Sequence, residues 1–169
     1  MGKTLTHFIN ALFILVFLAG LAGAIGSKPE HDMDAHEKAG IARIGDLIHE
    51  SVVDGYMLAY HILDLRDPKA DGMEKAIMDR TYAMTDENMV KPHHLMLYIM
   101  DKHHNLILNG KVGFMIKDPE GNFQKIMGMY MDRGFGATAD MKNKGIYTIK
   151  AKAIIGDKKL LDKFEYEME

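Results

Sequence analysis

Segments in which apolar and polar residues alternate, separated by turn-forming residues, most constrain how this chain folds. Near the C-terminus, Tyr147, Ile149 and Ala151 alternate with Thr148 and Lys150. Successive side chains of a β-strand point to opposite faces, so this period indicates a strand with one buried and one wet face. About eight such segments recur at the spacing typical of a sandwich. The sequence therefore predicts an all-β fold, an immunoglobulin-like antiparallel β-sandwich.

Four local signals refine this prediction. Asp54-Gly55 lies between two alternating runs, and the pair favours the tight turn of a β-hairpin because both residues tolerate positive φ. Asp71-Gly72-Met73-Glu74 has the spacing of a capping box, which predicts one short helix ending near Arg80. We interpret residues 81–92 as a loop, and the sequence Asp132-Arg133-Gly134-Phe135-Gly136 as a glycine-rich bend.

The N-terminus has the features of an export signal. Lys3 is followed by an apolar run from Phe8 to Leu21 and by the small residues Ala22-Gly23-Ala24. This pattern predicts a signal peptide over residues 1–24, a polar tether over 25–43 and the sandwich domain over 44–169. An uncleaved membrane anchor is the alternative, because the run approaches the ~20 apolar residues that span a bilayer. Either form predicts a periplasmic or otherwise extracytoplasmic protein.

Composition excludes several classes of function. The formal charge is −3, and the 21 Lys and Arg residues are scattered along the chain, so we expect no nucleic-acid partner. The motifs that mark nucleophilic hydrolases, nucleotide-binding loops and zinc peptidases are missing, so we expect a protein that is not an enzyme. The chain has no Cys. Any metal must therefore be held by His, Met, Asp or Glu side chains rather than by thiolates.

Two segments combine methionine and histidine in a way that suggests a metal site. In the segment 93–100 the alternation places His94 and Met96 on one face, and in the segment 123–131 it places three methionines on one face. Thioether sulfur is a soft ligand that suits Cu(I), and imidazole also binds copper. The predicted metal ligands are His93, His94, Met96, Met127, Met129 and Met131.

Other interpretations of these residues stay open. Methionine is an adaptable filler of small cores, so the 15 Met residues also fit ordinary packing. An alternative is a site for iron or another divalent metal, in which His and carboxylate side chains supply most of the ligands. His61 is expected to be a hydrogen-bonded structural histidine, although Met57 shares its face. A loose metal site at His31, Met33 and His36, or at the predicted turn residues His103 and His104, is also conceivable.

Part of the sequence resembles a known family. Asn109-Gly110-Lys111-Val112-Gly113-Phe114, the Met-rich segment that follows, and Lys144-Gly145-Ile146-Tyr147-Thr148-Ile149 together resemble the exported immunoglobulin-like modules of the YtkA-like group and, more distantly, the CopC-like copper carriers. The resemblance covers residues 92–169 and implies a sandwich outside the cytoplasm that handles copper. It differs from CopC-like carriers at the mature N-terminus, where Ile25 rather than a histidine would come first.

Two functions follow from these observations. The first is an exported metal-binding protein that binds or delivers copper through Met and His ligands. The alternative is a metal-free exported sandwich that docks onto a membrane or a periplasmic partner complex, with the methionines as an adaptable apolar contact surface. The metal-binding function requires the His93 and Met127 segments to lie close in space with their ligand-bearing faces together.

Overall fold

The computed structural model describes residues 43–169 except 70–71 and 85–90. The predicted signal peptide, most of the predicted tether and the His31, Met33 and His36 segment lie outside the described residues. In the described part of the chain, no helix has the length and apolar character needed to cross a bilayer. The elements in that part are β1 (Asp46–Val53), β2 (Tyr56–Asp64), α2 (Gly72–Met84), β3 (His93–Met100), β4 (Lys111–Lys117), β5 (Phe123–Met131), β6 (Gly134–Ala139), β7 (Gly145–Ile155) and β8 (Lys158–Met168).

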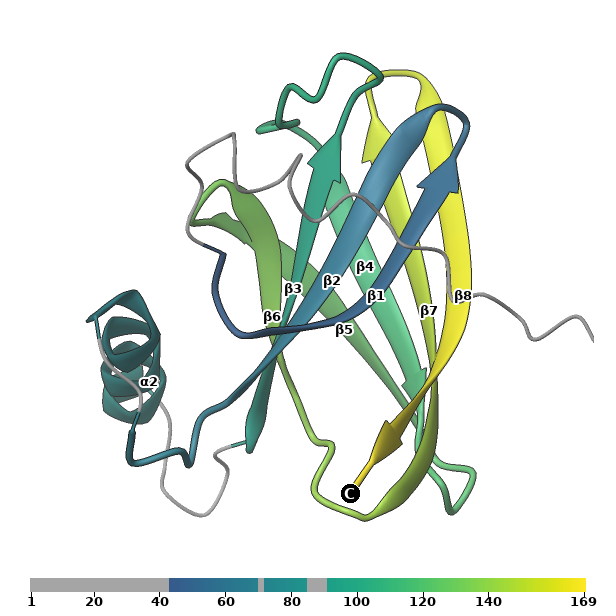
Figure 1. The fold of residues 1–169 in the computed structure, drawn as a ribbon. Helices are drawn as coiled ribbons and strands as arrows, with labels where there is room; N and C mark the ends of the chain where they lie inside the picture. The colour runs from purple at the N-terminus through teal and green to yellow at the C-terminus, as the bar shows by residue number, and fades with distance from the viewer. Residues whose placement is uncertain (1–42, 70–71, 85–90) are drawn as a thin grey trace, which may run out of the picture. The chain divides into compact units, whose positions relative to one another are not determined.

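The eight strands pair antiparallel in the order β1-β2-β3-β6-β5-β4-β7-β8 (Figure 1). β5 joins two layers, because residues 123–128 pair with β4 and residues 129–131 pair with β6. The two end strands also meet: Ser51 on β1 donates a hydrogen bond of 2.5 Å to the Asp162 carboxylate on β8. His49 stacks on Phe164 beside it, with ring centroids 4.2 Å apart. This contact closes the layers around the core.

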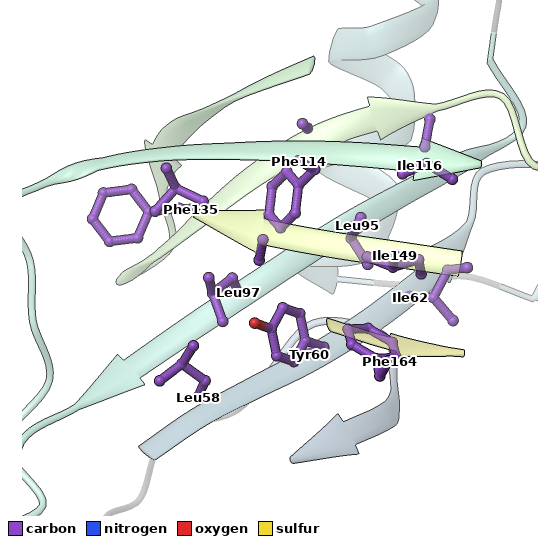
Figure 2. Close-up of a cluster of buried hydrophobic side chains, with 14 of the residues drawn as sticks. Leu58, Tyr60, Ile62, Leu95, Leu97, Phe114, Ile116, Phe135, Ile149 and Phe164 are labelled. Atoms are coloured by element: carbon purple, nitrogen blue, oxygen red, sulfur yellow. The ribbon is translucent and has the colours of Figure 1, made fainter. Parts of the chain in front are cut away.

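The main core lies between the layers and is built from the inward residues of the alternating strands. Figure 2 shows Leu58 and Tyr60 from β2 beside Leu97 from β3, with Phe114 from β4 and Phe164 from β8 facing them. Burying these large apolar side chains is the main favourable contribution to folding. The predicted antiparallel β-sandwich with one short helix is confirmed.

A second, smaller cluster covers the opposite face of β2 and β3. Ile77 of α2 packs there with Ala59, Leu63, Met96 and Tyr98. The start of the helix is attached to the sheet, because the backbone N–H of Gly45 donates to Glu74 at 3.1 Å. The helix therefore shields one end of this outer face from solvent.

Two local predictions were wrong. The predicted bend at residues 132–136 is a turn followed by strand β6: Asp132 and Arg133 take the positive φ values of 42° and 63°, and Gly134 already belongs to the strand. A Cβ on Gly134 would lie 3.0 Å from the Leu97 carbonyl oxygen, so glycine serves close packing there rather than turning. The helix also continues past Arg80 to Met84, into the predicted loop.

Candidate metal site

The site is assembled from two strands that are not neighbours. His94 and Met96 lie two residues apart on β3 and share its outer face, away from Leu95 and Leu97 in the main core. Met131 lies at the end of β5, and β6 runs between these two strands. Side chains from β3 and β5 therefore have to meet across the intervening strand.

Gly136 on β6 makes this meeting possible. In the strand register, Gly136 pairs with Met96 on one side and with Met129 on the other. A Cβ built on Gly136 would fall against His94 Nε2, 2.5 Å from Met96 Sδ and 2.6 Å from Met131 Sδ. One imidazole nitrogen and two thioether sulfurs thus occupy the space that any other residue would fill with its side chain.

His94 is buried, and among the described residues only one of its two ring nitrogens has a hydrogen-bond partner. Only 3% of its surface is exposed. Its Nε2 lies 3.1 Å from Met131 Sδ. Its Nδ1 has no hydrogen-bond partner in the described part of the chain. Burial lowers the pKa of His94 to about 4, so the ring is neutral at physiological pH. A neutral imidazole is the form that binds metal ions.

A groove of about 340 Å³ opens from this point to the surface. His94 and Met131 line its inner part, together with Gly136. Met127 and Met129 also line it and are 68% and 67% exposed, whereas Met131 is half-buried. The methionines on the outward side of β5 therefore form a row from the exposed Met127 and Met129 to Met131, which contacts the buried imidazole of His94.

The remaining candidates lie elsewhere. His93 is on the other face of β3, where its Nε2 is 3.8 Å from Asp64 and 3.4 Å from Arg66, so the structure does not bring it to Gly136. His61 donates from Nδ1 to the Gly45 carbonyl at 2.9 Å and meets the Tyr98 ring edge-on, as expected of a structural histidine. His103 and His104 are exposed turn residues.

The donor set at Gly136 favours a soft ion. Within the described ranges, no three His, Asp or Glu side chains come together as a possible metal cluster. A site of one nitrogen and two thioethers has no anionic ligand, which suits Cu(I) better than a hard or strongly charged ion. Arg80 and Lys91 also line the groove, and their positive charges make a divalent ion less favourable than a monovalent one.

Sequence reasoning missed Gly136. The ligand-bearing faces of residues 93–100 and 123–131 follow from alternation alone, but the pattern at residues 132–136 predicts a bend where strand β6 begins. A glycine flanked by Phe135 and Ala137 inside an alternating run signals a close approach by other groups. That signal is present in the sequence.

Comparisons with known proteins show a likeness of fold. No protein-family model and no curated protein matches the sequence. The structure is similar to that of a copper-bound variant of FetP from uropathogenic Escherichia coli, with a TM-score of 0.50, 15% identity, and coverage of 73% of this chain and 95% of FetP. A copper-bound variant of Campylobacter jejuni P19 gives a TM-score of 0.47 and 12% identity, with coverage of 74% and 96%. The similarity to FetP is a similarity of fold.

Proposed function

We propose that this protein binds copper as Cu(I) at His94 Nε2, Met96 Sδ and Met131 Sδ, and delivers it outside the cytoplasm. The observation that carries the proposal is the convergence of these three atoms over Gly136. Hydrogen bonding gives little reason for the burial of His94, because its Nδ1 has no partner among the described residues and its Nε2 lies against a thioether. Its position beside two thioethers is therefore better explained by a ligand than by packing.

The ligand chemistry explains the choice of ion. Thioethers and neutral imidazole select Cu(I) over harder ions, and none of the three carries a charge that would hold a divalent ion strongly. Arg80 and Lys91 at the groove oppose additional positive charge. Iron or zinc would need carboxylate or further imidazole ligands, and the described residues do not group them.

Met127 and Met129 give the proposed site a route for exchange. Both residues are exposed and line the same groove. A Cu(I) ion can bind first to these outer thioethers and then pass to Met131 and His94, because each step replaces one neutral soft ligand by another. This arrangement fits delivery rather than storage, since the inner site lies next to weak ligands that a receiving protein can displace.

Two further observations support the proposal. The solved FetP structure with a similar fold holds copper. The apolar N-terminal run and the lack of cysteine fit a protein exported to an oxidising space, where thiolate ligands would be at risk of disulfide formation. The metal-free docking function explains the exposed Met127 and Met129, but it gives no reason for the meeting of His94, Met96 and Met131.

A Cu(I) titration of the purified protein under reducing conditions tests the proposal. We expect one tightly bound ion per chain. Gly136→Ala places a methyl group where the three ligand atoms meet and should abolish this binding. Gly113→Ala is the matched control, because its Cβ would make only ordinary contacts, 3.4 Å from Met127 Sδ and 3.7 Å from the Ile126 carbonyl oxygen. The control should keep the full stoichiometry.

The outcomes separate the two functions. Unchanged stoichiometry in a folded Gly136→Ala variant would show that copper binds elsewhere. Lack of binding by the parent protein would favour metal-free docking. Circular dichroism of both glycine variants checks that the sandwich is retained.

A further inference from the structure

The outward face of the four strands β5, β4, β7 and β8 is strongly basic. Cross-strand pairs such as Met115↔Lys150 and Lys150↔Lys163 show that the outward residues of these strands form one continuous surface. We call it the lysine face. Its seven exposed lysines are Lys111, Lys117, Lys125, Lys150, Lys152, Lys159 and Lys163.

The charge of this face is opposite to that of the chain. The outward positions of the same strands include two carboxylates, Glu165 and Glu167, and both lie toward the C-terminal end of β8. The whole chain has a formal charge of −3. The positive charge is therefore concentrated on one side of the sandwich, where it attracts an anionic surface over a distance set by the salt concentration.

Apolar groups lie between the lysines. A groove of about 620 Å³ runs across the face, and Gly113, Met115 and Met127 are among the residues that line it. Leu161 and Phe123 are 55% and 62% exposed on the same face. The lysine side chains line this groove with flexible apolar stems that end in charged groups.

We propose that the lysine face docks onto the anionic phospholipid surface of a bilayer. Interfacial membrane binding combines Lys and Arg near anionic headgroups with apolar side chains that enter the boundary of the acyl chains. The lysine face supplies both kinds of group on one sheet surface. The predicted signal peptide or anchor at residues 1–24 brings the chain to a membrane in either form.

Other occupants fit the face less well. A second copy docked by two-fold symmetry would place the lysines opposite one another, and like charges at short distance are destabilising. A purely polar polyanion would not use the exposed Leu161 and Phe123. The proposal does not depend on copper binding. Met127 lines both this groove and the groove at Gly136 and His94, so docking would also place the proposed metal site beside the membrane.

Vesicle co-sedimentation of the exported protein tests the proposal. The probes are vesicles of phosphatidylcholine alone and vesicles that also contain phosphatidylglycerol. The N-terminal apolar segment, where retained, adds to binding of both kinds, so the difference between them reports the lysine face. We expect a clear preference for the anionic vesicles that weakens as salt is added. The triple variant Lys150→Glu, Lys152→Glu and Lys163→Glu should lower binding to anionic vesicles by more than about tenfold.

A charge-matched control separates the face from net charge. Lys69→Glu, Lys102→Glu and Lys144→Glu make the same change in charge at exposed positions outside the face, and this variant should keep most of the binding. Equal binding of the parent to both vesicles would overturn the proposal, as would an equal loss in the two triple variants. A folded face variant that still prefers anionic vesicles would also overturn it.

Discussion

His94 Nε2 lies 3.1 Å from Met131 Sδ, although the two residues are 37 positions apart and a third strand runs between theirs. The contact exists because Gly136 contributes no side chain to the surface between them. Met96 Sδ lies at the same point, and the three atoms together form the donor set of the candidate site. Four predictions follow from this site and from the fold that supports it.

Replacing Met131 by Leu should weaken Cu(I) binding strongly with little effect on the fold. Leu conserves volume, so we expect the free energy of unfolding to fall by less than about 1.5 kcal/mol. Loss of one of the three proposed ligands should raise the dissociation constant for Cu(I) by more than about 100-fold, beyond what loss of an outer-shell partner costs. Competition with a Cu(I) chelator measures the change. Equal affinity in parent and variant would remove Met131 from the ligand set.

The double variant Met127→Leu and Met129→Leu should act on rate rather than on final affinity. These exposed side chains lie at the mouth of the groove and outside the inner site. We expect Cu(I) transfer from a chelator to slow by about tenfold or more while the final stoichiometry stays the same. Stopped-flow absorbance follows the transfer. A loss of stoichiometry instead would make the outer sulfurs part of the resting site.

The metal-free protein should lose stability as the pH falls, partly through His94. Its pKa is about 4 in the folded state, below the ordinary value of 6.5, so the unfolded chain binds the proton more readily between these values. The His94 contribution is complete above about pH 6.5, falls toward pH 4 and levels off below it, with a loss of about 3 kcal/mol. Urea unfolding of the parent at several pH values measures the total loss, to which the other buried histidines add.

A substitution at His94 separates its contribution to the pH dependence of stability from those of the other histidines. Burial is also the leading cause that lowers the pKa of His49, His61 and His93, so the parent reports all four. The metal-free His94→Gln variant should show a shallower dependence on pH across the same window. The same slope in both proteins would contradict the assignment to His94.

The contact between the end strands should matter for stability. Ser51→Ala removes the hydrogen bond to the Asp162 carboxylate that joins β1 to β8. Hydrogen bonds to charged groups contribute about 1.5–3 kcal/mol, and we expect the lower end here because Asp162 is only partly buried and His49 remains 3.6 Å away. Thermal unfolding measures the effect. Thr148→Ala, at a partly buried position on β7, is a control that should change stability much less.

Alternation and turn chemistry were sufficient to predict the sandwich and the two faces of β3. The Asp54-Gly55 hairpin is confirmed, with positive φ at both residues, because that turn depends only on local backbone preferences. The path between β3 and β5 was not predictable in this way. Strand order depends on which long-range pairs bury the most apolar surface, and neither period nor turn residues report that choice.

The same limit applied to the candidate site. His94 and Met96 could be placed on one face from the sequence, but their meeting with Met131 required the position of β6. His93 appeared equivalent to His94 because the two are adjacent. The structure separates them, since neighbouring residues of a strand point to opposite faces, and His93 lies beside Asp64 and Arg66 instead.

The proposed ligands all belong to the outward side of strands whose inward side holds the main core. Leu95, Leu97 and Ile126 pack inside, while Met96 and Met131 lie on the opposite surface of the same strands. Binding and release of an ion at the proposed site would therefore leave the main core in place. Such a scaffold differs from small zinc modules, which collapse when their ion is lost. The metal-free protein would therefore stay folded and able to bind another ion.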